Sequence, residues 1–253
     1  MHLSFVDDIN KQIKNFIMEK QIQVSNKGAT LDTNRRNFLK LGGVGLVVAG
    51  LTLAGCRDDN YQYVEPDSIF DLGKGDVGIL NYAYALEQLE ADFYTKVVNG
   101  FYTGISDAEK QVFTDIYNHE VIHRDFFKAA LLAAGATPTP KLEFKYDGVD
   151  FKSRTSILAT AKALEDTGVA AYNGAGKYIT NLDYLVIAGK IVSVEARHAS
   201  AIRDLINPGS GDFAGDDVVA ANGLDVAKEP KEIVAAAGAF FKTPFTWKEQ
   251  GIG

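Results

Sequence analysis

Two short stretches of this 253-residue chain decide its fold: Glu120-Val-Ile-His123 and Glu195-Ala-Arg-His198. A lone glutamate lies about thirty residues before each copy, Glu87 before the first and Glu165 before the second. Side chains three residues apart project from the same face of a helix, so each copy presents a carboxylate and an imidazole together. The chain has only four histidines, and random placement of its glutamates around them would give fewer than one such spacing.

Both motifs and both lone glutamates interrupt apolar faces with helical spacing. The faces around the motifs read Phe113, Ile116, Glu120, His123, Phe127, Ala130 and Ala188, Ile191, Glu195, His198, Ile202, Leu205. The faces around the lone glutamates read Leu80, Ala83, Glu87, Glu90, Tyr94, Val97 and Leu158, Ala161, Glu165, Gly168, Tyr172, Ala175. Apolar residues spaced alternately by three and four mark the buried side of an amphipathic helix. The sequence therefore predicts that these carboxylates lie inside a helical bundle.

Carboxylates buried together need a compensating charge. Four of them in an apolar interior are very unfavourable without positive charge close by. Two divalent cations would supply it, and a glutamate on each of two helices with a Glu-x-x-His on each of two others is a di-metal carboxylate ligand set. The alternative is that the clustered carboxylates raise one another's pKa and some stay protonated. Metal binding is the simpler explanation of the complete set.

Capping and stop signals predict four long helices. Asp76 is a good N-cap, Ser106 to Glu109 reads as a capping box, and Asn207-Pro208-Gly209 stops the last helix. The predicted helices run from about 76 to 99, from 106 to 135, from Ser153 or Thr155 to about 179, and from about 181 to 207. Short first and third connections make antiparallel neighbours, and the long connection over 136–153 is a crossover. We therefore predict an all-α fold, an antiparallel four-helix bundle over residues 76–206.

The C-terminal residues 207–253 are predicted to form a loop and a short helix over 231–242. This segment either caps the bundle or packs on its side. The net charge of −7 argues against nucleic acid as a partner, because nucleic-acid binding uses basic surface.

Residues 1–56 read as an N-terminal extension with an export signal, and residues 57–75 as a tether. Arg35-Arg36-Asn37-Phe38-Leu39-Lys40 precedes an apolar stretch that ends in Leu53-Ala54-Gly55-Cys56. That stretch is too short for a permanent membrane span, and its order of basic, apolar and small residues is typical of an export signal. It resembles a twin-arginine signal joined to a bacterial lipobox. The resemblance implies cleavage before Cys56, lipidation of this cysteine and a periplasmic or outer-surface lipoprotein. The other interpretation is a buried helix with a stray cysteine.

The two predicted hairpins resemble repeats of one another. Ala85-Leu86-Glu87 with Tyr94 seven residues on matches Ala163-Leu164-Glu165 with Tyr172 seven residues on. The match pairs Glu87, rather than Glu90, with Glu165. Tyr94 and Tyr172 are most simply core aromatics whose buried hydroxyls need partners, with a role beside the metals as the alternative.

These features together resemble the ferritin-like superfamily, in particular an exported group related to plant desiccation-associated proteins. The resemblance covers residues 76–206. It implies that Glu87, Glu120 and His123 serve one metal and that Glu165, Glu195 and His198 serve the other. It also implies that Glu120 and Glu195 bridge the two ions.

Five further side chains are considered for accessory roles. Glu90 stands where the other hairpin has Gly168, and it is interpreted as either an extra metal ligand or an acceptor behind the ligands. His119 points about 100° away from Glu120 and is predicted to be a surface residue. Candidates to orient the ligands from behind are Asp92, Asp166 and Asp204.

The predicted function is a membrane-anchored di-metal oxidoreductase that acts on O2, peroxide or Fe(II). Carboxylate and imidazole suit iron and manganese alike, and iron is the favoured cofactor. Assembly into an oligomer is compatible with this interpretation. One alternative is a non-enzymatic, stress- or desiccation-associated envelope protein in which the metals stabilise the bundle. Another is a helical scaffold with vestigial ligands.

Overall fold

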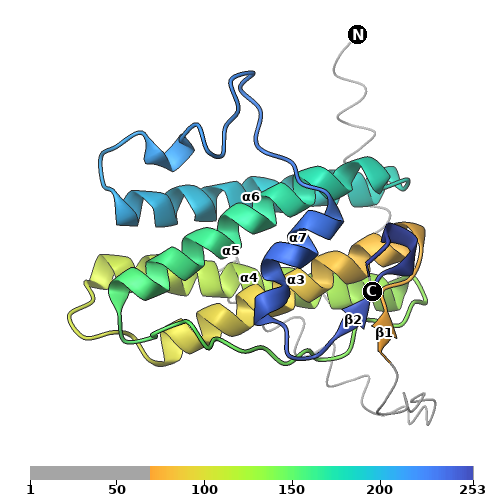
Figure 1. The fold of residues 1–253 in the computed structure, drawn as a ribbon, viewed down its shortest axis with the longest axis horizontal. Coiled ribbons are helices and arrows are strands. Elements are labelled where there is room, and N and C mark those ends of the chain that lie inside the picture. The colour runs from red at the N-terminus through yellow and green to blue at the C-terminus, as the bar shows by residue number, and fades with distance from the viewer. Residues whose placement is uncertain (1–68, 253) are drawn as a thin grey trace, which may run out of the picture. The chain divides into compact units, whose positions relative to one another are not determined.

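The structure is a computed structural model that describes residues 69–252, and its main feature is a bundle of four long helices (Figure 1). These helices are α3 (Gly75–Asn99), α4 (Asp107–Ala133), α5 (Arg154–Ala175) and α6 (Leu182–Ile206). Helices α3 and α4 form one hairpin and α5 and α6 a second, and the hairpins meet through α3–α5 and α4–α6 contacts. The predicted all-α bundle of two helical hairpins is therefore confirmed.

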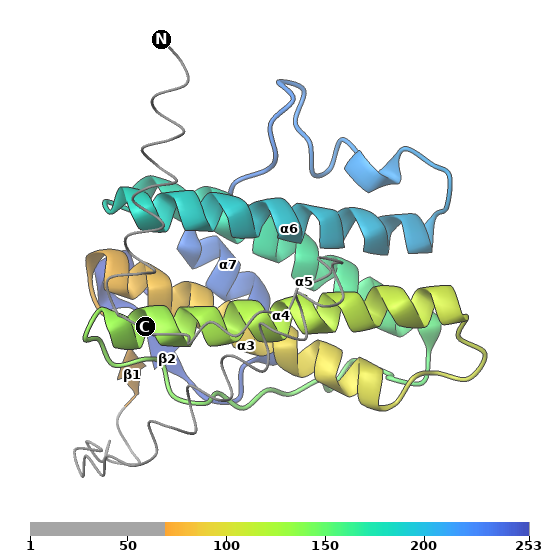
Figure 2. The same ribbon diagram turned by 180° about the vertical axis from the view of Figure 1, so that it is seen from behind.

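Short elements surround the bundle in the described part of the chain. A two-stranded parallel sheet pairs the beginning of the described part with its end, and Phe70 lies opposite Phe245 in it. The elements are β1 (Phe70–Asp71), η2 (Gly176–Tyr178), η3 (Asp212–Ala214), α7 (Pro230–Ala237), η4 (Gly238–Phe240), β2 (Phe245–Thr246) and η5 (Lys248–Gln250). Helix α7 lies on the side of the bundle that faces the viewer in Figure 1, whereas α4 and α6 face the viewer in Figure 2.

Polar side chains start three of the long helices where the sequence predicts. Ser106, Ser153 and Asn181 are the N-caps of α4, α5 and α6, and each accepts a backbone N–H with its side chain. The Ser106 bond comes from the N–H of Glu109 at 3.1 Å. The buried Glu109 carboxylate does not complete the capping box, because Arg154 donates to it through Nε at 3.1 Å. This charge pair joins the starts of α4 and α5.

Helix α3 begins one residue earlier than predicted, and Asp76 is not its N-cap. Lys74 holds that position without a side-chain cap, and the Glu249 carboxylate accepts the Gly75 N–H at 2.7 Å. A carboxylate at a helix N-terminus is favoured by the helix dipole. Asp76 instead accepts the backbone N–H of Thr180 at 2.7 Å. Partners this distant in the sequence leave no local signal in the capping pattern.

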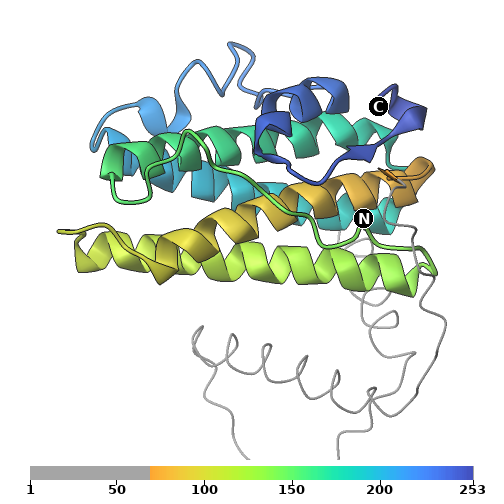
Figure 3. The ribbon, with the colours of Figure 1, turned by 60° about the horizontal axis from the view of Figure 1, so that its bottom comes forward.

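The crossover over residues 134–153 runs along α3 (Figure 3). Three polar residues on one face of α3 hold it there through backbone or hydroxyl groups. The Thr139 N–H donates to the Asn81 side chain at 2.7 Å, and the Leu142 N–H donates to the Gln88 side chain at 3.0 Å. Further along, Tyr146 donates its hydroxyl to Asp92 at 2.9 Å. These bonds let the crossover cover the outer side of α3 without leaving its polar groups unpaired.

The C-terminal segment packs on the side of the bundle, and its helix is shorter than predicted. A capping box between Glu229 and Glu232 starts α7, but the chain tightens into a 3-10 turn at Gly238. The segment then pairs with β1, so that Leu72 is fully buried and donates its N–H to the Thr246 carbonyl at 2.8 Å. The last residues of the predicted tether, 70–75, are therefore part of the fold. Residues 1–68, including Cys56, lie outside the described residues.

The backbone before α7 comes very close to α5 at Gly174. The Lys228 N–H donates to the Ala170 carbonyl at 3.1 Å, which brings the Lys228 carbonyl against the helix. A Cβ atom at position 174 would lie 1.7 Å from that oxygen. Glycine is therefore the residue that permits this approach.

We expect Gly174→Ala to destabilise the protein by about 1–3 kcal/mol, because the tail must move away from α5. Chemical unfolding followed by circular dichroism measures the change. Gly189→Ala is the matched control, since that glycine is also inside a helix and nothing lies within 4 Å of its added Cβ. The control should gain about 0.5–1 kcal/mol from helix propensity. Equal effects of the two substitutions would contradict the proposed close contact.

Candidate metal centre

The six predicted ligands converge at the middle of the bundle. Each of the four long helices contributes at least one of them, and all six side chains are buried. They form two sets in which one atom from each residue lies within 4.8 Å of the others: Glu87, Glu120, His123, Glu195 and Glu120, Glu165, Glu195, His198. Glu120 and Glu195 belong to both sets. These two carboxylates therefore lie between the two positions at which ions would be held.

Each histidine approaches the carboxylate that comes from the facing helix. His123 Nδ1 on α4 lies 2.8 Å from Glu195 Oε1 on α6, and His198 Nδ1 on α6 lies 2.8 Å from Glu120 Oε1 on α4. The lone glutamates are slightly farther away, with Glu87 Oε2 3.6 Å from His123 Nδ1 and Glu165 Oε2 3.5 Å from His198 Nδ1. These two distances match between the halves, but His198 Nδ1 also lies 2.9 Å from Glu195 Oε2 of its own motif, whereas His123 Nδ1 lies 3.8 Å from Glu120 Oε2.

The donor atoms fit metal ions better than they fit one another. Among residues 69–252, the buried atoms of the site without a hydrogen-bond partner are Glu87 Oε2, Glu120 Oε1, Glu120 Oε2, His123 Nδ1, Glu165 Oε2 and Glu195 Oε1. Some are close in space, yet the close pair His123 Nδ1 and Glu195 Oε1 is not aligned as a hydrogen bond. Buried polar atoms normally have partners. Cations held between these atoms would satisfy all of them.

Burial and crowding shift the pKa values of the carboxyl groups in the absence of a cation. Burial, and then the charge of Glu195, raise the pKa of Glu87 and raise that of Glu120 well above its usual value. Burial also acts to raise the pKa of Glu195, but the two neighbouring imidazoles outweigh it and hold that pKa at about 2. Burial acts to lower the pKa of His123, yet the surrounding carboxylates raise it to about 12. The cluster therefore draws positive charge strongly.

Two tyrosines link the hairpins through the lone glutamates. Tyr94 on α3 donates its hydroxyl to Glu165 on α5 at 2.5 Å, and Tyr172 on α5 donates to Glu87 on α3. Burial raises the pKa of both phenols well above the usual value, so each keeps its proton and acts as the donor. The repeated Glu-to-Tyr spacing in the sequence thus produces a reciprocal pair of bonds. Each bond orients one oxygen and leaves the other turned toward the site.

A model of the ferritin-like domain family matches residues 75–208, which is more than half of the chain. The chain belongs to the ferritin-like domain family. The match begins with α3 and ends just beyond α6, so it contains all six converging residues. No curated protein matches the sequence.

Glu90 and Gly168 face one another across this ferritin-like bundle. A Cβ atom added to Gly168 would lie 2.9 Å from Glu90 Oε1, so the glycine leaves the space that the carboxyl group fills. Glu90 is 3% exposed, and burial followed by the charges of Glu120, Glu195, Glu165 and Glu87 raise its pKa well above the usual value. The carboxyl group of Glu90 and the missing side chain of Gly168 therefore fit one another and account together for this difference between the hairpins. Glu90 belongs to neither of the two sets of converging ligand atoms.

His119 is not the surface residue that the sequence predicts. Its ring is half-buried and stacks on that of His198, with centroids 5.1 Å apart and planes inclined by 9°. His119 Nδ1 lies 2.9 Å from His198 Nε2, the nitrogen that faces away from the carboxylates. The direction predicted from helix periodicity was correct, but helix α6 covers that flank of α4. Ligating histidines commonly bond through their second nitrogen, and His119 is the partner that sequence analysis missed.

The three aspartates considered as supports for the ligands lie elsewhere. Asp92 binds Tyr146 of the crossover and Lys96, and Asp204 accepts the Gly209 N–H. Asp166 forms a two-bond pair with the buried Arg203 at 2.8 Å. Arg203 also binds Asp217 in the loop after α6. These aspartates hold the loops and crossover in place and do not touch the six converging residues.

We expect Tyr94→Phe and Tyr172→Phe to destabilise the protein by about 1–3 kcal/mol each, because each leaves a buried carboxylate oxygen without its donor. Thermal or urea unfolding measures the cost. Tyr82→Phe is the matched control, since the Tyr82 hydroxyl is buried with no hydrogen-bond partner among the described residues. Removing it should be close to neutral. A Tyr94→Phe cost no larger than that of Tyr82→Phe would contradict this role.

Proposed function

We propose that the protein is a di-metal carboxylate oxidoreductase that acts on O2, peroxide or Fe(II). One observation carries the proposal: six buried side chains from four helices converge, and most of their inward-facing atoms have no other partner. Glu87 and His123 would hold one ion, Glu165 and His198 the other, and Glu120 and Glu195 both. Iron is the favoured metal, and carboxylate with imidazole also suits manganese.

A pair of bound ferrous ions would supply one electron each, which is what the reduction of O2 to hydrogen peroxide with two protons needs. The chain's own residues would position the ions and exclude water. Tyr94 and Tyr172 hold the outer oxygens of the lone glutamates, and His119 holds His198 from behind. Ligands supported in this way keep their geometry.

Metal content should depend on which glutamate is changed. We expect Glu120→Gln and Glu195→Gln to lose both ions, because each residue belongs to both sets. Glu87→Gln and Glu165→Gln should each lose one. Elemental analysis of natively purified protein gives the metal-to-chain ratio, and Asp92→Asn controls for loss of a carboxylate on α3 outside the site. Two ions retained by Glu120→Gln would refute the shared-ligand assignment, and a metal-free wild-type protein would refute the centre.

The alternative is a non-enzymatic, stress- or desiccation-associated envelope protein in which the same ions stabilise the bundle. Binding energy at a site that forms only on folding adds directly to stability. Loaded protein that oxidises Fe(II) with O2, or consumes peroxide, supports the oxidoreductase. Loaded protein without either activity, whose Tm falls sharply after chelation, supports the alternative.

We further propose that the chain is exported and anchored to a bacterial envelope membrane through a lipid on Cys56. The paired arginines, the short apolar stretch and the Leu-Ala-Gly-Cys56 sequence support this proposal. Among residues 69–252, no helix is long and apolar enough to cross a membrane.

Radioactive palmitate should label the full-length chain in a bacterial host, and Cys56→Ser should abolish the label. Replacing Arg35 and Arg36 together by lysine should retain the precursor in the cytoplasm, because the twin-arginine pathway reads that pair. Equal labelling of the wild-type and Cys56→Ser chains would contradict lipidation at this residue.

A further inference from the structure

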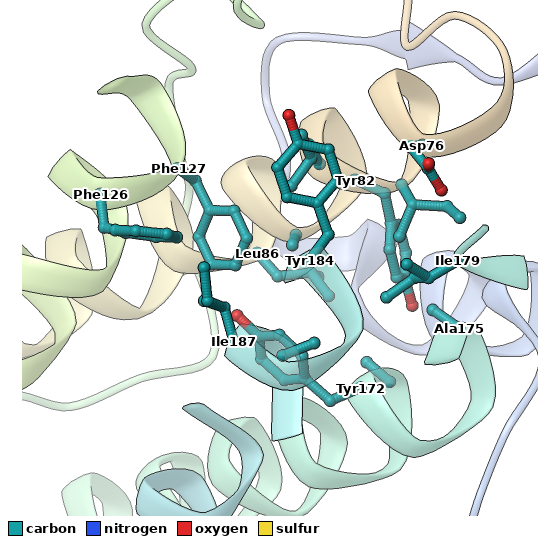
Figure 4. A pocket seen from close by; sticks show the side chains of 15 residues that line it. Asp76, Tyr82, Leu86, Phe126, Phe127, Tyr172, Ala175, Ile179, Tyr184 and Ile187 are labelled. Atoms are coloured by element: carbon teal, nitrogen blue, oxygen red, sulfur yellow. The ribbon is translucent and has the colours of Figure 1, made fainter. Parts of the chain in front are cut away.

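An apolar cavity of about 30 Å³ lies at the end of the bundle where α3 begins and α5 ends. All four long helices line it, and Asp76 is the only charged residue among the fifteen that do so. Figure 4 shows the rings of Phe126, Phe127, Tyr172 and Tyr184 around the space. The cavity therefore lies between the four long helices at this end of the bundle.

The cavity adjoins one half of the candidate metal centre. Tyr172 lines it and donates its hydroxyl to Glu87. Leu86, another lining residue, directly precedes Glu87, and Phe127 follows His123 by one helical turn. The rings of Phe127 and Tyr172 lie 6.2 Å apart. The space thus ends at the side chains that orient and flank the Glu87–His123 pair.

At three of the lining positions the matching residue of the other hairpin is larger. The repeat that pairs Glu87 with Glu165 also pairs Phe93 with Ala171 and Val97 with Ala175, and the motif repeat pairs Phe113 with Ala188. The three alanines line the cavity. The three larger residues are at most 1% exposed and pack beside Tyr94, which corresponds to Tyr172. These three small side chains therefore contribute space at this end of the bundle.

Size and polarity determine what this space can hold. Room for one water-sized molecule needs about 10–15 Å³, and apolar cavities stay dry and take up apolar atoms or molecules. A cavity of about 30 Å³ is too small for a drug-sized ligand and suits a diatomic molecule. We propose that this cavity is a binding site for O2 beside the Glu87–His123 half of the metal centre. The assignment rests on the proposed reaction of that centre with O2.

Krypton, an apolar atom, is the probe for occupancy. Crystals of the full chain held under krypton pressure should show one anomalous peak in the cavity. Ala188→Phe and Ala175→Val introduce the residues found at the matching positions of the other half, and either should remove the peak. Absence of a peak in the wild-type protein overturns the proposal, even where the metal centre itself is present.

The second measurement is the rate at which O2 oxidises the Fe(II)-loaded protein, followed by stopped-flow absorbance. The filled variants should keep their metal content and lose rate at low O2, because less O2 is stored beside the site. Hydrogen peroxide is polar and does not gain from an apolar cavity. The rate at which peroxide oxidises the Fe(II)-loaded protein should therefore stay at the wild-type value. Gly189→Ala, on the exposed side of α6 next to Ala188, should leave both rates unchanged.

The outcomes separate this proposal from the proposed function. A krypton peak in a protein that binds no metal would refute the metal centre and, with it, the role of the cavity in O2 chemistry. A loaded, active protein whose O2 rate is the same with the cavity open and filled would refute the cavity site alone. Equal losses with O2 and with peroxide would show damage to the centre and would also overturn the proposal.

Discussion

The mutual repulsion of buried carboxylates is the constraint that the rest of this structure must satisfy. Four glutamates of the two ligand sets share one interior with Glu90, where removal from water already disfavours their charged forms. Two imidazoles and two phenols partner only some of these carboxylate oxygens, and neither oxygen of Glu120 has a hydrogen bond among the described residues. Cations at the centre would stabilise such a bundle, because an unpaired buried charge is far more costly than a paired one.

The segments outside the bundle serve the same constraint by keeping water away from α3. Seventeen residues of α3 are buried, which is more than an amphipathic helix on a bundle surface buries. The crossover covers its outer face through Asn81, Gln88 and Asp92, and Trp247 of the tail packs on Tyr82 with centroids 5.2 Å apart. Glu87 and Glu90 are therefore enclosed on every side. The low polarity that strengthens ligand–cation attraction at the centre depends on these coverings.

The sequence was sufficient for the bundle because its signals are local and periodic. The apolar spacing placed Glu120 and Glu195 on inward faces, and the cap residues Ser106, Ser153 and Asn181 placed three helix starts. Interactions between distant segments were not predictable in the same way. His119 has the periodicity of a flank residue, and only the packing of α6 against α4 turns that flank toward His198. The C-terminal segment can lie against α5 only because Gly174 has no Cβ. The sequence does not indicate that a distant segment packs at this glycine.

Duplication explains the symmetry of the centre, and divergence makes its two halves different in kind. The repeat keeps both Glu–Tyr pairs but sets Glu90 against Gly168, and it sets His119 against Val194, which has no polar atom for His123. Phe93 and Phe113 pack one end tightly where Ala171 and Ala188 leave the other open. The Glu165–His198 half, which His119 supports, is the tightly packed half. The Glu87–His123 half beside the cavity has no such second histidine. Two ions held there would share Glu120 and Glu195 yet differ in rigidity and in access to small apolar molecules. Chemistry that needs one stable ion and one reachable ion would use such an asymmetry.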